Sequence, residues 1–141
     1  DSLQLEQKVN FTSSLNKSGG YSYFSVNLFS NLETNPFIAE KRISDIDFGV
    51  PQLYTIFGNY SIPPGFSFDG LPENISMSTP DHDIEFNRIS KAEDNLLNVR
   101  VTVEFKRSFY PASDYGIVKE FYKKMIDKLA EQVVIKKNST P

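Results

Sequence analysis

The sequence predicts a mainly β protein, an antiparallel β-sandwich of about seven strands that ends in one amphipathic α-helix. Three observations lead to this prediction. Apolar and polar residues alternate over 97–105, as in a long strand with one solvated face. Shorter apolar runs lie between turn residues, without the strand–helix alternation that is typical of parallel sheets. From residue 115 the apolar spacing changes to three and four, which is the period of a helix.

The first strand is predicted over residues 3–11, whose odd positions carry the apolar side chains Leu3, Leu5, Val9 and Phe11. A turn at 16–20 separates it from an aromatic strand over 21–29. The apolar phase slips within this second strand, which predicts a β-bulge. Residues 30–51 are predicted to form a long packed loop because Pro and Gly surround the apolar pair Phe37 and Ile38.

The next strand is expected over 53–62, where Pro63, Pro64 and Gly65 stop it with a turn. Shorter strands are expected over 75–78 and 84–90. The long alternating strand over 97–105 follows the turn residues Glu93, Asp94 and Asn95.

The helix is predicted to begin near Ser113, a candidate N-cap residue. Its apolar stripe consists of Tyr115, Val118, Tyr122, Met125, Ile126 and Leu129. A stripe of this size needs a cover, and we expect it to pack on the sheet of the same domain. The alternative is that it is a docking face for a neighbouring domain. The β-branched residues Val133, Val134 and Ile135 are predicted to add a last short strand.

With 141 residues the chain fits a single domain, 1–141, with the sandwich over 1–110 and the helix and terminal strand over 111–137. It starts abruptly within a predicted strand. This favours a domain excised from the C-terminus of a longer polypeptide over a mature protein.

Composition excludes several classes of site. The absence of cysteine excludes disulfides, thiolate metal sites and a cysteine nucleophile. The formal charge of −3 and the scattered basic residues argue against a nucleic-acid partner. No apolar run approaches the roughly 20 residues that cross a bilayer, so no membrane insertion is predicted. We expect no catalytic residue, no cofactor and no metal in this chain.

The only histidine lies in the motif Asp81-His82-Asp83. Carboxylates beside an imidazole could bind a metal or transfer protons. However, adjacent residues of a strand point to opposite faces, and Pro80 precedes the motif, so we favour a solvated turn. His82 is also the only imidazole base for a Ser or Thr nucleophile, and no GxSxG motif is present.

Asp45 and Asp47 are two residues apart and could hold calcium, but the full ligand spacing of a calcium loop is missing, so turn capping beside Gly49 is favoured. Asn-x-Ser/Thr triplets begin at Asn10, Asn16, Asn59, Asn74 and Asn138. The many aromatic side chains could stack on sugars, although most are expected in the core.

Several fragments resemble one family when they are taken in order: Asn35-Pro36-Phe37, Arg42 followed by Asp45-Ile46-Asp47-Phe48-Gly49, the 60–66 stretch Tyr-Ser-Ile-Pro-Pro-Gly-Phe, Leu71-Pro72, and the helix and ending over 115–137. Over residues 31–137 they resemble the C-terminal β-domain, a domain of unknown function, of bacterial transglutaminase-like proteins. Asp45 departs from the pattern, because the family usually has Pro there.

The resemblance implies that the catalytic Cys, His and Asp belong to a papain-like core upstream, so no catalytic residue is carried over to this chain. It implies a noncatalytic accessory domain that packs on that core or on a partner. It also implies an extracytoplasmic location, in the periplasm or at the surface of a Gram-negative bacterium, where the Asn triplets would be incidental. An ion pair between Arg42 and Asp47 is expected to pin the packed loop. The alternative function is a free-standing carbohydrate- or peptide-binding module that uses exposed tyrosines to bind a glycan or protein ligand.

Overall fold

The computed structural model describes residues 3–12, 15–28 and 30–138. It is mainly β, with antiparallel sheets and one C-terminal helix, which confirms the predicted fold class. Ten strands are present in the described residues, where about seven were expected. The large sheet has the order β4-β8-β7-β6, from the strands β4 (Gln52–Ser61), β8 (Leu96–Phe105), β7 (Ile84–Glu93) and β6 (Ile75–Ser78).

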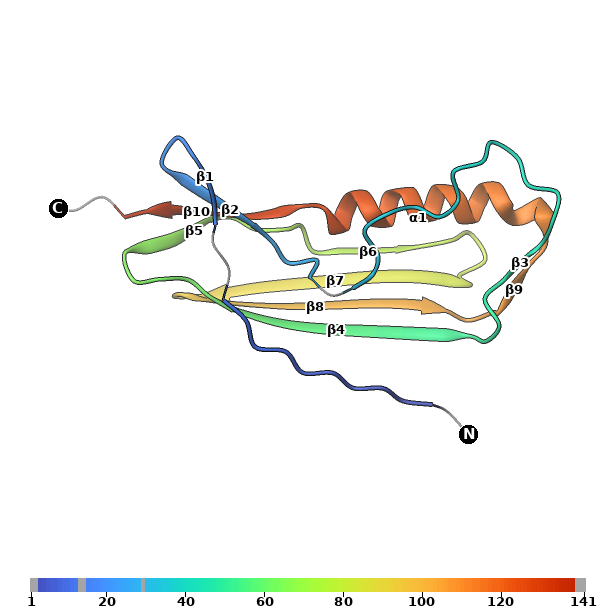
Figure 1. Ribbon diagram of the computed structural model, residues 1–141, viewed down its shortest axis with the longest axis horizontal. Helices are drawn as coiled ribbons and strands as arrows, with labels where there is room; N and C mark the ends of the chain where they lie inside the picture. The colour runs from blue at the N-terminus through green and yellow to red at the C-terminus, as the bar shows by residue number, and fades with distance from the viewer. Residues whose placement is uncertain (1–2, 13–14, 29, 139–141) are drawn as a thin grey trace.

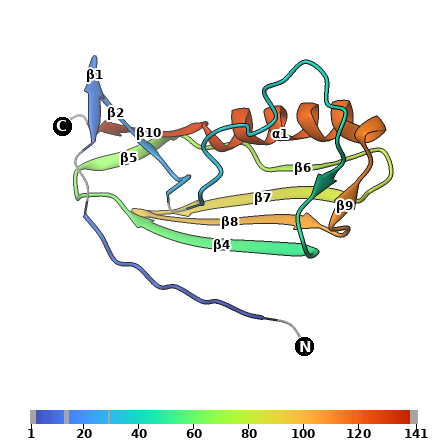
Figure 2. The ribbon, with the colours of Figure 1, turned by 45° about the vertical axis from the view of Figure 1, so that its right-hand side comes forward.

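A second sheet has the order β1-β2-β10-β5, formed by β1 (Asn16–Ser18), β2 (Tyr21–Ser25), β10 (Gln132–Lys137) and β5 (Phe66–Gly70). The short strands β3 (Ile46–Asp47) and β9 (Phe109–Tyr110) pair with each other. Figure 1 shows two layers: the large sheet forms one, and the second sheet and helix α1 (Tyr115–Leu129) lie end to end in the other. The turned view in Figure 2 shows the same arrangement. One face of the large sheet is therefore covered, and the core lies beneath that cover.

The hairpin of β7 and β8 is the centre of the large sheet. Its register runs from Ile84 opposite Phe105 to Glu93 opposite Leu96, and Asp94 in the connecting turn has a φ of 51°. The inward side chains of β8 are all buried: Leu97, Val99, Val101, Val103 and Phe105. The alternation seen in the sequence thus divides this strand into a core side and a solvent side.

Helix α1 buries the predicted stripe against this sheet. Met125 is 0% exposed, and Tyr122 packs on Phe105 of β8 with ring centroids 5.7 Å apart. Phe121 is also buried, although the predicted stripe did not include it, whereas Ile126 is only partly buried. The expectation that the stripe packs on its own domain is confirmed.

The predicted N-cap was wrong. Ser113 lies in a short 3₁₀ turn, Ala112–Asp114, and its hydroxyl donates to the Asp114 carboxylate at 3.2 Å. Asp114 is the N-cap residue, and no side chain caps the helix there. The 3₁₀ turn already uses the backbone of these residues, since the Asp114 N–H donates to the Pro111 carbonyl.

The strand expected over 3–11 was also wrong, since residues 3–12 form no regular secondary structure. Leu3 and Leu5 are 100% and 90% exposed. Alternation gives a segment two distinct faces, but a strand also needs a hydrogen-bonding partner.

Two further expectations concern the second sheet. The bulge expected in 21–29 does not occur in β2, which ends at Ser25 and pairs with β10 in continuous register. The irregularity lies instead between Val134 and Ile135, where β10 pairs with β5. Residue 29 lies outside the described residues. The loop over 30–51 is packed in part: Phe37 is 6% exposed, but Ile38 beside it is 85% exposed. The loop also contains β3.

Candidate functional site

The outer face of the large sheet is the side that the helix does not cover. Alternation directs one set of side chains inward and leaves the other set on this face. The most exposed large apolar side chains there are Leu53 and Phe57 on β4 and Ile89 on β7, which are 64%, 70% and 59% exposed. The guanidinium of Arg100 lies over the Phe57 ring at 5.4 Å from its centroid, a cation–π contact.

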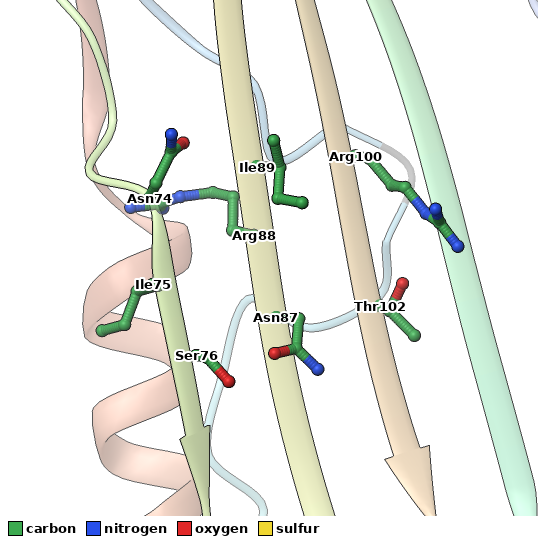
Figure 3. A pocket seen from close by; sticks show the side chains of 8 residues that line it. All are labelled: Asn74, Ile75, Ser76, Asn87, Arg88, Ile89, Arg100 and Thr102. Atoms are coloured by element: carbon green, nitrogen blue, oxygen red, sulfur yellow. The ribbon is translucent and has the colours of Figure 1, made fainter.

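An open hollow of about 540 Å³ lies over β6, β7 and β8. Figure 3 shows side chains around it from all three strands, with hydroxyl, amide, aliphatic and guanidinium groups: Asn74, Ser76, Asn87, Ile89, Arg100 and Thr102. The Asn74 side chain already accepts a hydrogen bond from the Ser90 N–H at 2.6 Å. The remaining groups offer donors, acceptors and one positive charge to a polar surface. The alternating pattern of β8 predicted a solvent-exposed polar face. The pattern could not predict where on this face the hollow lies.

Arg88 lies at the edge of this hollow but points into the protein, and its side chain is 0% exposed. It donates to the Glu73 carbonyl from Nε at 2.9 Å and from a terminal nitrogen at 2.6 Å. It also donates to the Lys128 carbonyl at the end of α1, and it forms an ion pair with Glu131. Arg88 thus joins the large sheet to the end of the helix.

Lys128 completes this cluster with bonds of 2.8 Å to the carboxylates of Glu73 and Glu131. Burial acts to raise the pKa of Glu131, but hydrogen bonds from Lys128, the Glu73 N–H and Arg88 outweigh burial and lower it. Sequence analysis did not single out Arg88. Its spacing from Ile84 and Phe86 could have indicated its burial, because alternate positions of one strand share a face.

The Asp81-His82-Asp83 motif forms the solvated turn that was favoured. His82 is exposed with a φ of 59°, and its Nδ1 lies 3.0 Å from the Ser78 hydroxyl. The two carboxylates bind Arg107, at 3.1 Å from Asp81 and 2.5 Å from Asp83. In the part of the chain that the structure describes, no three His, Cys, Asp or Glu side chains are grouped to hold a metal ion.

The environment of the two carboxylates differs. The Thr79 hydroxyl donates to Asp81 at 2.7 Å and lowers the pKa of that group. Burial, together with the hydrogen bond to Asp81, raises the pKa of Asp83. Arg107 also stacks on Tyr110 of β9 at 4.8 Å. These contacts tie the turn to the segment after β8, which is a structural role.

Asp47 has the turn-capping role beside Gly49 that was favoured over calcium, whereas Asp45 bonds to a distant part of the chain. Asp47 accepts from the Gly49 N–H, and Asp45 from the Ala112 N–H, each at 2.8 Å. The expected ion pair between Arg42 and Asp47 does not form. Arg42 donates instead to the carbonyl and hydroxyl of Ser44, at 3.0 and 3.1 Å, because these acceptors are close to it in the chain.

Three of the seven tyrosines belong to the buried core, and Tyr60 packs against it. Tyr110, Tyr115 and Tyr122 are buried, and burial raises the pKa of Tyr122 far above its usual value. The exposed pair, Tyr21 and Tyr54, at 39% and 41%, lie on different sheets. They therefore do not share a strand surface on which a sugar could stack.

A solved structure has a fold similar to that of this chain. The fold is similar to the crystal structure of a "putative protease" from Parabacteroides distasonis, with a TM-score of 0.64 and 10% sequence identity. The match covers 83% of this chain and 23% of that chain, so this chain spans under a quarter of the matched protein. At this identity the likeness concerns the fold alone. A search of curated proteins found no match.

No helix in the described ranges is long and apolar enough to cross a membrane. Residues 20–135 match DUF3858, described as a domain of unknown function with a solved structure. This match begins just before β2 and ends within β10, so it takes in the large sheet, the helix and most of the second sheet. The chain therefore belongs to the DUF3858 family.

Proposed function

We propose that this is a noncatalytic accessory domain that docks, through the outer face of its large sheet, on an upstream domain of the same polypeptide. The observation that supports the proposal is the exposure of Leu53, Phe57 and Ile89 on a face that the helix leaves bare. Large apolar side chains exposed on one face of a sheet are a feature of interaction surfaces. The matched protein is several times longer than this chain, which is consistent with further domains beside it.

The upstream domain that we propose is a papain-like transglutaminase or protease core, in a bacterial cell-envelope protein. The resemblance over residues 31–137 supports this parent, and the fold likeness to a "putative protease" is compatible with it. This chain contains no cysteine, so the thiol nucleophile of such a core would lie outside it. The domain would then position that core or its substrate.

The polypeptide encoded by the complete reading frame provides the test. Phe57→Ser and Ile89→Ser should leave the Tm of the isolated domain within about 2 °C, because both side chains are exposed. In the whole polypeptide the same changes should uncouple the unfolding of this domain from that of its neighbour in calorimetry. Thr55→Ser, on the same face of β4, is the matched control. Unchanged coupling in the Phe57→Ser and Ile89→Ser variants would refute docking through this face.

Catalysis is tested separately, on the isolated chain. Peptidase, amidase and transglutaminase assays should give no turnover. Reproducible turnover that a single substitution abolishes would overturn the noncatalytic role.

A free-standing glycan- or peptide-binding module is the second candidate, and the polar hollow beside Asn87, Arg100 and Thr102 favours it. NMR titration of the isolated chain with oligosaccharides and short peptides tests it. Binding would shift the amides of β7 and β8 around the hollow, and Arg100→Ala would abolish those shifts.

A further inference from the structure

We infer that two copies of this chain pair through the free edge of β4, antiparallel and about a two-fold axis, so that their four-stranded sheets form one continuous sheet. Among the described residues β4 pairs with β8 alone, so its other edge is an end of the large sheet. In an antiparallel ladder every second residue directs its N–H and C=O groups away from the neighbouring strand. The free edge of β4 therefore offers donors and acceptors to another strand.

This edge lacks the features that usually protect an edge strand from pairing. Gln52–Ser61 contains no charged residue and no proline, and its register with β8 is continuous from end to end. Leu53, Tyr54 and Thr55 are exposed in succession, so this part of the strand is open on both faces of the sheet. Residues 3–12 pass on the β4 side in Figure 1, but they are exposed and form no strand. A long, uncharged and regular edge is a template for another strand.

The sequence of β4 is complementary to itself in one antiparallel register. With Thr55 opposite its own copy, Leu53 lies opposite Phe57 on both sides of the axis. These are the two most exposed apolar side chains of the strand, at 64% and 70%, and they share the outer face. On the other face the same register places Tyr54 opposite Ile56. Directly opposed apolar side chains stabilise paired strands, so the register covers apolar surface of both copies.

Neighbouring registers of the same pairing lose this match. With Ile56 opposite its own copy, Leu53 would face Asn59. With Phe57 opposite its own copy, Leu53 would face Ser61. Because one strand supplies both members of each apolar pair and no charge opposes its own copy, a second copy of this chain is the occupant that fits the edge.

The pairing is separate from the docking proposed above. It uses the backbone edge of β4, whereas the docking uses the outer face of the sheet, although Phe57 takes part in both. It extends only from Gln52 to Gly58 in each copy, so the dimer should be weak and depend on protein concentration. The dimer is measured on this chain alone and the docking on the whole polypeptide, so the failure of one can be told from the failure of the other.

Sedimentation equilibrium of this chain between about 10 μM and about 0.5 mM tests the dimer. The wild type should shift from monomer towards dimer as the concentration rises. Thr55→Lys should remain a monomer, because it places like charges opposite each other at the edge. Thr102→Lys is the matched control, since it makes the same change on the same face of β8, away from the edge, and should preserve the dimer. Circular dichroism checks that both variants are folded.

Two results of this experiment would overturn the inference. One is a wild type that stays a monomer at every concentration. The other is a Thr55→Lys variant that associates as strongly as the Thr102→Lys control, because the contact would then lie elsewhere on the chain.

Disulfide cross-linking tests the register, because the chain has no cysteine of its own. Thr55→Cys would place two thiols on opposed residues with Cβ atoms about 4.5–5.5 Å apart, so mild oxidation should give a covalent dimer. Asn59→Cys, on the same face, is the control, since its two copies would be about 26 Å apart at about 3.3 Å per residue. Cross-linking of Asn59→Cys or Phe57→Cys as fast as that of Thr55→Cys would overturn the register.

Discussion

Substituting Met125 by Asp gives a direct measure of how strongly the helix is bound to the sheet. Met125 is 0% exposed, so the variant loses a buried side chain at a cost of about 2–5 kcal/mol. A buried carboxyl without a partner adds about 1–3 kcal/mol. The sum, about 3–8 kcal/mol, is a large part of the roughly 5–15 kcal/mol that stabilises a domain. The Tm should fall by at least about 12 °C, at about 4 °C per kcal/mol.

The loss should depend on pH in a defined direction. Burial raises the pKa of the introduced Asp in the folded state above its unfolded value of about 3.9. Below the unfolded pKa both states are protonated, and the penalty for charge is absent. As pH rises above about 3.9 the unfolded state ionises first, and the variant loses up to about 1.4 kcal/mol per pH unit until the folded pKa is reached.

The matched control is Ile117→Asp, at a position on the same helix that is 46% exposed. It should change the free energy of unfolding by less than about 1 kcal/mol. Urea unfolding followed by circular dichroism between pH 3 and pH 7 measures both variants. A Met125→Asp variant as stable as the control, or one with no added pH dependence, would refute the assignment of Met125 to the core.

Three further predictions concern the Arg88 cluster and two glycines. Arg88→Met should lower the free energy of unfolding, measured in urea, by about 2–4 kcal/mol. Glu131→Gln should lower it less, because glutamine still accepts a hydrogen bond from Arg88. The reverse order would refute the central role of Arg88 in this cluster. The folded pKa of Glu131 is lowered from 4.5, so its stabilisation is present above that pH and is lost as pH falls below it. The stability curves of wild type and Glu131→Gln should therefore converge in acid. Gly49→Ala should destabilise the protein by about 1 kcal/mol, because Gly49 has a φ of 79°. Gly116→Ala should stabilise it by about 0.5–1 kcal/mol, because Gly116 lies in the helix with open space at its Cβ position. Equal effects of the two changes would refute the assignment of these backbone conformations.

Elements with a strong local pattern were predictable from the sequence. The strand over 96–105 was found almost to its ends, because its alternation and the preceding turn agree. The helix stripe was found for the same reason, with a period that no strand can produce. These elements carry most of the core.

Elements defined by a partner were not predictable. Strand β5 was missed because Phe66–Gly70 is short and ends in glycine, and its pairing with β10 joins distant parts of the chain. Residues 3–11 have an alternating pattern, but they form no strand in the structure. In both cases the deciding interaction lies outside the segment.

The candidate site was predictable only in part. Alternation placed Arg100 and Thr102 on the solvent-exposed side of their strand. How much of the sheet stays uncovered, however, depends on where the helix packs. The burial of Arg88 depends on Glu73, Lys128 and Glu131, which come from the loop before β6 and from the end of the helix. Convergence of this kind is a property of the tertiary structure.

The position of β10 has a consequence for the order in which the protein folds. This strand lies between β2 and β5 and bonds to both, yet it is synthesised after the whole of the large sheet. During translation β2 therefore stays unpaired along one edge, and β5 stays without its strand partner, until β10 has left the ribosome. The large sheet can form earlier from its sequential hairpin. Completion of the second sheet is then a late step of high contact order, and a chain that terminates before residue 132 would expose both edges to other molecules.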